Sequence, residues 1–526
     1  VVHTGELEPW NAGAVDPSAG DVGWWFDFSA VQAPGRYYVA DVEQAVRSAT
    51  FRIGENVYQN TLKAAVRAFY YQRSGFEKRA PFADACWTDA AAYLGPGQDG
   101  EARDINRRDD PGTARDLRGG WFDAGDTNKY VTFASPAVHQ LLMAYQDHPQ
   151  VFTDDFNLPE SGNGIPDLID EVRWQMDWLQ RMQNPDGTVL LKVGGTQHSA
   201  AAPPSSDAQA RYYVGACPSA TVAAAAMYAH AAHVFRPFDA LEADADDLLQ
   251  RAIRALQAYQ RQPNKDTNCD NGTVLAGDAD ATVEYQEATA VVAAIYLLAE
   301  TGEPEYREFV KAHYRRLKPY HDSGWSRYDP HMGEALLYYT RLPQADADLS
   351  QAILDDKLND ARNSSGIYGD SGDDLYRNHL HTPQYHWGSN SIRARYGNTN
   401  ADMLRNDLDQ ARAGQYRDRA LETLHYFHGV NPFGLVYLSN MYPYGATYSA
   451  NEIFSYWFAP DTRWSNARTS DCGPAPGFLA GGPNASAAQK GVPGHRMPPG
   501  GQPPQKSYRD WNKHWPEASY AITEPS

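Results

Sequence analysis

The chain has 526 residues, of which 42% are hydrophobic, and a formal net charge of −20 at pH 7. This length is sufficient for a large core and more than one domain, and no apolar run reaches the eighteen residues of a transmembrane helix. The negative charge argues against nucleic acid or an anionic membrane surface as a partner.

The first 54 residues have the pattern of short β-strands. Residues 23–29, 35–41 and 49–54 are rich in β-branched and aromatic side chains, and Gly, Pro and Asp separate them. In residues 56–73 the apolar positions instead recur every three or four residues, which indicates a helix. We therefore expect a small β domain over residues 1–70 and a second domain over residues 71–526.

Helical patterns dominate the second domain. In one predicted helix, Leu168, Val172 and Met176 belong to a single apolar stripe, and Pro166 suits the first turn. The predicted helices are residues 131–146, 166–183, 220–235, 243–260, 282–300, 305–317 and 401–428. Long loops separate them, notably at residues 191–218, 363–398 and 442–519, and loops of that length in a compact domain are usually functional. This alternation favours an α-helical toroid with elaborated loops.

The four cysteines are scattered along the chain and have no metal-like spacing. Cys86, Cys217, Cys269 and Cys472 allow three disulfide pairings, and the sequence does not choose among them. The chain opens at Val1 without an initiator Met or an apolar leader segment, as it would after removal of a signal peptide. We expect a secreted or periplasmic protein that is a monomer.

Two acidic residues stand out in residues 119–126, which read Gly-Gly-Trp-Phe-Asp-Ala-Gly-Asp. Glycine lets the backbone approach a ligand closely, and Trp121 and Tyr130 supply flat rings of the kind that stack on sugars. Cleavage of a glycosidic bond by water needs one carboxylate to take a proton from that water and a neighbour to hold it. Asp123 and Asp126 could do this, or they could simply cap turns or the following helix.

The sequence of this stretch closely resembles the Asp-Ala-Gly-Asp signature of glycoside hydrolase family 9, the inverting cellulase family. The resemblance implies a mainly α fold, an (α/α)6-barrel catalytic domain preceded by a small all-β immunoglobulin-like domain. The first strands of that β domain would lie before Val1. The resemblance also implies that Asp126 is the general base and that Asp123 helps to hold the water, with no cofactor required.

The resemblance places the general acid near the end of the chain. Residues 515–524 resemble the family's C-terminal segment, in which a Glu opens the last helix and donates the proton. This match points to Glu524, with Glu517 as the alternative, although either could be a solvated terminal residue. The family's last helix would continue beyond Ser526. Residues 502–510 are also family-like and place Tyr508 in the substrate site, near Asp510, which could be structural.

Elsewhere the sequence departs from the family pattern. Family members usually carry a Pro-His-His-Arg stretch after an Asn-Pro, and this stretch supplies a His and an Arg to the substrate. Here no His or Arg follows Asn431-Pro432 through residue 453, and Tyr448, Asn451 and Glu452 are the candidates for that work. A further candidate cleft loop carries His386 and Trp387, although a lone His is more often structural.

Calcium is the only metal ion for which the sequence offers a candidate site. Zinc is not favoured, because Cys86 is the only cysteine before the acid pair and Thr127 stands where a zinc-binding His could follow it. Residues 152–157, with Glu160 and Asp167, are rich in oxygen ligands and could hold calcium. A capped and solvated helix start explains the same residues.

Three functions remain open from the sequence. The first is an endo-β-1,4-glucanase that acts with inversion on cellulose-like β-glucans or cellodextrins. The second is an exo-β-glucosaminidase on chitosan oligosaccharides, for which the missing His-His-Arg stretch and the negative charge leave room. The third is a non-catalytic carbohydrate-binding protein, which is least favoured because binding does not require three carboxylates.

Overall fold

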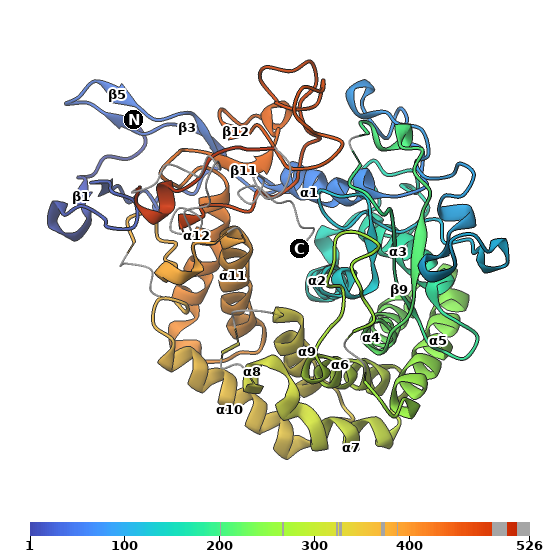
Figure 1. The fold of residues 1–526 in the computed structure, drawn as a ribbon. Coiled ribbons are helices and arrows are strands. Elements are labelled where there is room, and N and C mark those ends of the chain that lie inside the picture. The colour runs from blue at the N-terminus through green and yellow to red at the C-terminus, as the bar shows by residue number, and fades with distance from the viewer. Residues whose placement is uncertain are drawn as a thin grey trace.

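The helices of the chain follow one another around a ring, from α1 at the top of Figure 1 to α12 at the upper left. This computed structural model describes residues 1–199, 201–265, 268–321, 324–325, 329–369, 374–386, 388–485 and 502–512. The described helices are α1 (Gln59–Gln72), α2 (Val131–Asp147), α3 (Asp167–Met182), α4 (Pro218–Phe235), α5 (Glu242–Arg261), α6 (Val283–Thr301), α7 (Pro304–His313), α8 (Lys318–His321), α9 (Pro330–Thr340), α10 (Ala347–Asn363), α11 (Ser389–Arg405) and α12 (Ala413–Phe427).

The ring has an inner and an outer layer of helices. Nearly every residue of α4 is buried, and α6 is buried from Ala288 to Leu298. In contrast, α5 buries one stripe that includes Ala245, Leu248 and Ala252, and its charged residues face outward. A helix that is apolar all round packs inside a protein, whereas an amphipathic helix covers its surface. Two such layers make the α/α barrel that the sequence implies.

Most predicted helices agree with the structure within two residues at each end. The prediction of one helix over residues 401–428 is wrong, because α11 ends at Arg405 and α12 begins at Ala413. Between them Asp407 and Asp409 have φ angles of 51° and 49°, a left-handed backbone that a right-handed helix cannot contain. The helix predicted over residues 305–317 also ends early, at His313, and continues as a 3-10 turn.

The N-terminal region contains short antiparallel strand pairs, as its sequence pattern predicts. The pairs are β1 (Glu8–Pro9) with β2 (Trp24–Trp25), β3 (Gly35–Tyr37) with β6 (Phe51–Ile53), and β4 (Ala40–Asp41) with β5 (Val46–Arg47). This region contacts the barrel, since the Trp25 indole donates to the Leu375 carbonyl and the Tyr376 hydroxyl donates to Asp21, each at 2.9 Å. The immunoglobulin-like topology and the boundary at residue 70 stay predictions.

A four-stranded sheet lies beside the acid pair. Its order is β7 (Arg103–Asp104), β10 (Tyr212–Ala216), β9 (Leu190–Gly194) and β8 (Lys129–Tyr130). Strand β8 begins three residues after Asp126 and leads directly into α2. The sheet and the inner helix therefore fix the chain immediately after the two acids.

The structure selects one of the three possible cysteine pairings. Cys86 is bonded to Cys472, which joins segments 386 residues apart, and Cys217 is bonded to Cys269. The second bond ties the residue that precedes α4 to the loop that leads into α6. None of the helices among the described residues has the length and apolar character needed to span a membrane.

Candidate active site

The acid pair lies on a loop that backbone contacts hold on both sides. Phe122 N–H donates to the Gln72 carbonyl at 2.8 Å, and Asp123 N–H donates to the Asn128 carbonyl at 3.0 Å. Gly125 faces residues 454–456, and a Cβ there would lie 2.3 Å from a ring carbon of Phe454. Glycine is therefore required at position 125, where Tyr456 N–H donates to the Gly125 carbonyl at 2.8 Å.

Asp126 is a half-buried carboxylate with two hydrogen-bond donors. Asn128 N–H donates to its Oδ1 at 2.9 Å, and the Tyr130 hydroxyl lies 3.1 Å from its Oδ2. Burial raises the pKa of Asp126, and the two hydrogen bonds oppose that rise because they favour the charged form. A carboxylate with a raised pKa is a better proton acceptor than an exposed one, which suits a general base.

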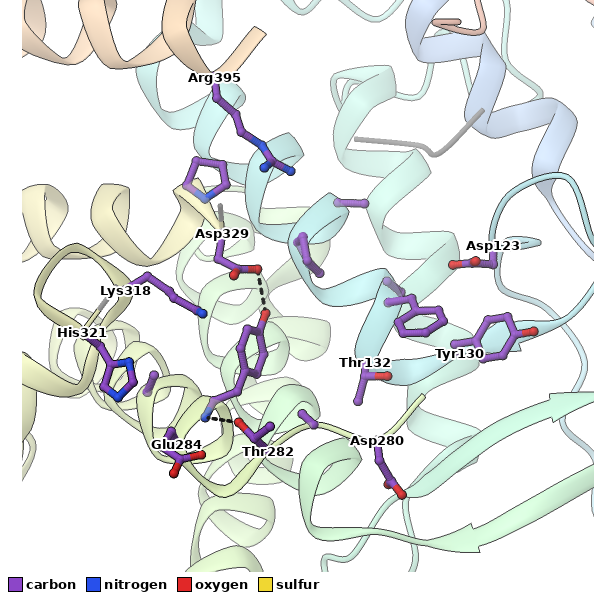
Figure 2. Close-up of a pocket in the computed structure, with 18 of the residues that line it drawn as sticks. Asp123, Tyr130, Thr132, Asp280, Thr282, Glu284, Lys318, His321, Asp329 and Arg395 are labelled. Atoms are coloured by element: carbon purple, nitrogen blue, oxygen red, sulfur yellow. Dashed lines mark hydrogen bonds between the residues drawn. The ribbon is translucent and has the colours of Figure 1, made fainter. Parts of the chain in front are cut away.

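A cavity of about 580 Å³ opens beside this loop. Asp123, Tyr130 and Trp121 line it on one side, and Figure 2 shows Asp123 and Tyr130 facing Lys318, His321, Asp329 and Arg395 across it. This volume is typical of sites that bind small molecules or a few sugar units. Asp126 does not line the cavity itself, but its hydrogen-bond partner Tyr130 does.

Trp121 forms a fixed part of the cavity wall. Its side chain is only 4% exposed, and its indole N–H donates to Glu171 Oε1 at 2.7 Å. Its ring packs against Phe69, with the ring centroids 5.0 Å apart. The same Glu171 forms a fully buried ion pair with Arg73. The structure therefore places Trp121 at the cavity while the core determines its orientation.

Four residues that the sequence placed near the substrate, in two separate segments, are linked to other groups by hydrogen bonds. Asn451 donates to Asp510 Oδ2 from its backbone at 2.8 Å and from its side chain at 3.0 Å, and the Tyr508 hydroxyl donates to Oδ1 at 2.7 Å. Glu452 accepts from the Asn466 side chain at 2.9 Å. Burial raises the pKa of both Glu452 and Asp510. The structure thus brings Asn451, Glu452, Tyr508 and Asp510 together, outside the lining of the cavity.

The remaining predicted residues lie outside the cavity lining or at undescribed positions. Tyr448 is 57% exposed. Burial lowers the pKa of His386, and the nearby charge of Arg395, which lines the cavity, lowers it further. Trp387, Glu517 and Glu524 lie outside the described residues, so the general acid stays a prediction.

Two residues that the sequence did not single out lie next to the acid loop. His198 Nδ1 is 2.5 Å from the Tyr456 hydroxyl, and both line a small polar pocket together with Thr127 and Asn128. The charge of Asp126 adds to burial in raising the pKa of Tyr456. The sequence carries one usable hint, because Tyr456 lies in an aromatic-rich stretch, residues 454–458, shortly after Asn451-Glu452.

Among the described residues, one group of three His, Cys, Asp or Glu side chains has ligand atoms within 4.8 Å of one another. It consists of Cys217, Cys269 and Asp280. Because the two cysteines are joined in a disulfide, they offer no thiolate to a metal ion.

Comparison with known proteins identifies the family. The model of glycosyl hydrolase family 9 matches residues 58–525. Endoglucanase C of Cellulomonas fimi is 29% identical over 98% of this chain and 46% of its own length, so the chain spans about half of that relative. Endoglucanase D of Acetivibrio thermocellus is 28% identical over 87% of this chain and 68% of its own length.

A solved structure supports the same assignment. The metagenome-derived family 9 endoglucanase has a TM-score of 0.80 and 27% identity, and the match covers 98% of this chain and 87% of that one. This similarity confirms the mainly α barrel fold. The family match includes the acid pair, the cavity and the helices of the ring. The chain therefore belongs to glycosyl hydrolase family 9.

Proposed function

We propose that the chain is an inverting endo-β-1,4-glucanase that acts on cellulose-like β-glucans or cellodextrins. The observation that carries this proposal is Asp123 on the wall of a sugar-sized cavity, with Asp126 three residues on and bonded to Tyr130 of the same wall. The relatives named above are endoglucanases, which favours a glucan over the glucosamine alternative. A family 9 member with both acids present also fits catalysis better than binding alone.

In the proposed reaction Asp126 takes a proton from a water molecule that Asp123 helps to orient. The water oxygen then bonds to the anomeric carbon from the face opposite the leaving oxygen, and the glycosidic bond breaks. Glu524 gives its proton to that leaving oxygen, so charge is balanced across the step. In an inverting enzyme the acid and base carboxyl groups are roughly 6.5–9.5 Å apart, which leaves room for the water. The raised pKa of Asp126 supports its role as the base.

Anomer analysis tests the proposal directly. The purified chain is incubated with cellodextrins, a soluble β-glucan and glucosamine oligomers, and proton NMR records the first-formed reducing end. We expect hydrolysis of the glucans with the α anomer appearing first. A first-formed β anomer would rule out inversion, and hydrolysis of the glucosamine oligomers alone would select the alternative substrate. A fall in viscosity that precedes the release of reducing ends would identify endo action.

We propose that the protein acts outside the cytoplasm. We also propose that it is a monomer. Two disulfides support this location, because such bonds persist in oxidising compartments and are rare in the cytosol. The prediction is checked by fractionating the source cells and by measuring the mass of the native protein in solution. Activity confined to the cytosolic fraction, or a native mass of twice 58.4 kDa, would contradict it.

We also propose structural calcium at the first turn of α3 and the loop that leads into it. Asp167 Oδ1 and Asp170 Oδ1 are buried and have no hydrogen-bond partner in the described part of the chain. Burial, together with the nearby charges of Glu160 and Asp167, raises the pKa of Asp170 to about 7. A divalent cation would bind these oxygens and remove that cost. Calcium should raise the melting temperature and a chelator lower it, and both effects should be absent in Asp170→Asn.

A further inference from the structure

The Tyr130 hydroxyl lies at the junction between Asp126 and the loop over residues 268–280. Ala276 N–H donates to it at 2.9 Å, and the Asn128 side-chain amide donates to it at 3.3 Å. Two acceptors compete for its own proton, since Asp126 Oδ2 and the Leu275 carbonyl are both 3.1 Å away. The two incoming donors use the lone pairs of the hydroxyl oxygen. Its single proton can be donated to only one of the two acceptors.

Asp126 is the stronger of the two acceptors. The Leu275 carbonyl already accepts a hydrogen bond from the Asn128 side chain. A carboxylate forms a stronger, charge-assisted hydrogen bond than a carbonyl does. Burial and the charge of Asp126 raise the pKa of Tyr130 far above its usual value, so the phenol stays protonated at any working pH. The proton of Tyr130 therefore points to Asp126.

The loop that presents Ala276 is held by a buried lysine. The Lys192 side chain is fully buried, and its ammonium donates to Asp270 Oδ2 at 2.6 Å, to the Val274 carbonyl at 2.7 Å and to the Ala276 carbonyl at 3.3 Å. Lys192 is also the strand partner of Tyr130 in the pairing of β8 with β9. One side chain thus connects the strand that carries Tyr130 to the loop that binds its hydroxyl.

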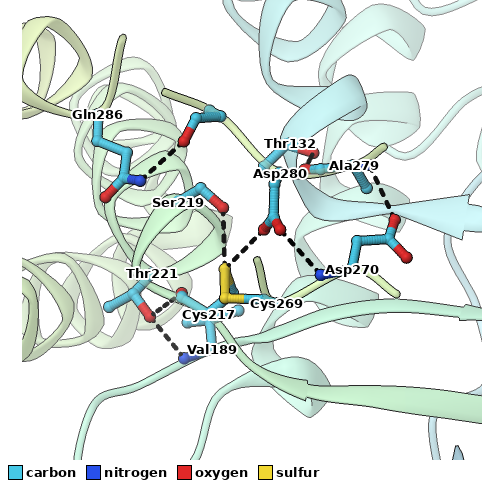
Figure 3. Close-up of a disulfide and its surroundings, with 11 residues drawn as sticks. Thr132, Val189, Cys217, Ser219, Thr221, Cys269, Asp270, Ala279, Asp280 and Gln286 are labelled. Carbon is cyan, nitrogen blue, oxygen red and sulfur yellow. Dashed lines mark hydrogen bonds between the residues drawn. A yellow bond between two sulfur atoms is a disulfide. The ribbon is translucent and has the colours of Figure 1, made fainter. Parts of the chain in front are cut away.

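The same loop is fastened at both of its ends. The Cys217–Cys269 disulfide fixes its beginning to the start of α4, and Figure 3 shows this bond beside Asp280 and Thr132. Asp280 accepts from Asp270 N–H at 2.8 Å, and the Thr132 hydroxyl donates to the Ala279 carbonyl at 2.7 Å. These contacts restrain the loop against both the acid segment and the inner helices.

We propose that Tyr130 and Lys192 are positioning residues for Asp126. Lys192 fixes the loop, the loop holds the Tyr130 hydroxyl through Ala276, and the hydroxyl orients and stabilises the Asp126 carboxylate. The other oxygen of Asp126 is held by Asn128 N–H, so the whole carboxylate is fixed in direction. This inference rests on the proposed role of Asp126 as the general base.

The test compares Tyr130→Phe, Lys192→Met and the double variant by the pH profile of kcat/KM on a cellodextrin. A hydrogen bond to a charged group lowers the pKa of a carboxylate, so its loss should move the acid limb up by about one to two pH units in Tyr130→Phe. Lys192→Met should move the limb in the same direction by a smaller amount. The double variant should show no shift beyond that of Tyr130→Phe, because both changes act through one hydroxyl.

Lys357→Met is the matched control. Lys357 is equally buried and interacts with Asp402, but it extends from α10 and contacts α11 on another part of the ring. Its loss should lower the melting temperature and leave the acid limb in place. An unmoved limb in Tyr130→Phe, or shifts that simply add in the double variant, would overturn the proposal.

A second measurement separates this inference from the proposed function. Selective ¹³C labelling of the aspartate carboxyls gives the pKa of Asp126 by NMR titration, with Asp126→Asn used to assign its signal. Tyr130→Phe and Lys192→Met should both raise that pKa, whether or not the protein hydrolyses a glucan. An inactive wild type would reject the function alone, whereas an unchanged Asp126 pKa in Tyr130→Phe would reject the positioning role.

Discussion

Helix α2 connects two regions that both contain buried or half-buried ionisable side chains. One region stabilises a charged carboxylate, whereas the other holds its ionisable groups in the neutral form. Just before its start, Asp126 is a carboxylate with two hydrogen-bond donors, beside a cavity that Asp123 and Tyr130 line. In its middle, His139 lies inside the barrel with its ring stacked near those of His230 and His331, at centroid distances of 5.1 and 5.3 Å. Burial alone therefore does not identify a functional acid or base.

The group of histidines inside the barrel, together with Glu334, is uncharged. His139 and His230 share a hydrogen bond of 2.9 Å between their Nδ1 atoms, and burial lowers the pKa of both rings well below the usual value. Burial lowers the pKa of His331 to about 4 and raises that of Glu334 to about 8. All of these groups are neutral near pH 7. The acid loop instead supplies donors for a charged carboxylate next to a cavity, which is what catalysis requires.

The largest expected effect is that of Asp126→Ala on kcat. General acid–base catalysis by one placed side chain contributes about 10²–10⁴-fold, so kcat should fall by at least that order while substrate binding is largely retained. Asp123→Ala should be comparable or somewhat milder, because Asp126 can still accept a proton from a poorly held water. Azide should restore activity to a base variant, since it replaces the attacking water. If substitution of an interior residue such as His331 or Glu334 lowered kcat equally, the contrast between the acid loop and the barrel interior would fail.

The next effect depends on the substrate and concerns Glu524. Glu524→Ala should reduce cleavage of natural β-glucans by about 10²–10⁴-fold, because their leaving oxygen needs a proton. The loss should be much smaller on an aryl glycoside with a good leaving group. Glu452→Gln is the control, since Glu452 has a raised pKa but is bonded to Asn466 away from the cavity lining. Equal losses on both substrates would show that Glu524 is not the proton donor.

The sequence predicted the elements that local patterns determine. The helices α2 to α6 have clear apolar periodicity or uniform burial, and their predicted bounds were close. Helices α9 and α10 were not predicted, because their neighbouring loops and mixed composition hide the period. The division between α11 and α12 was missed because it depends on the backbone angles of Asp407 and Asp409, which sequence periodicity does not reveal.

The residues of the candidate site also fall into two groups: those that a local motif identifies and those that only the fold brings together. Asp123, Asp126 and Tyr130 lie within one short stretch, so a motif can identify them, and their roles stay a prediction. Lys192 and His198 come from other parts of the chain and approach this stretch only in the fold. Lys192 pairs with Tyr130 between strands, and His198 bonds to Tyr456, whose N–H donates to the Gly125 carbonyl. Asn451 and Tyr508 bond to Asp510, and their role in substrate binding stays a prediction. Tertiary hydrogen bonding of this kind has no local sequence pattern.

The stability of the protein should fall with rising pH because of Glu334. Its pKa is raised by burial first and then by Asp402, so the folded protein keeps the proton while the unfolded chain loses it above about pH 4.5. Stability therefore falls by up to about 1.4 kcal/mol per pH unit between pH 4.5 and 8 from this group. Glu334→Gln should remove that slope without loss of activity near pH 6. Urea unfolding at pH 6 and 8.5 measures it, and an unchanged slope would contradict the assignment.

The smallest expected effect is the acid sensitivity that His331 confers on the same interior. The folded pKa of about 4 lies below the unfolded value, so from about pH 6.5 downward the unfolded chain binds a proton that the folded protein does not. This group should cost up to about 3 kcal/mol of stability by pH 4, and no more below it.

Charged groups near His331 modify this effect without reversing it. Burial is the main cause of the lowered pKa, Asp329 opposes it, and Arg395 adds to it. In His331→Phe the ring keeps its stacking on His139, but no proton can bind in either state. Urea unfolding at pH 7.5 and 4.5 should therefore show a variant whose stability deficit at pH 7.5 shrinks at pH 4.5. A deficit of equal size at both pH values would mean that the interior tolerates a charged His331, and the contrast with the acid loop would then fail.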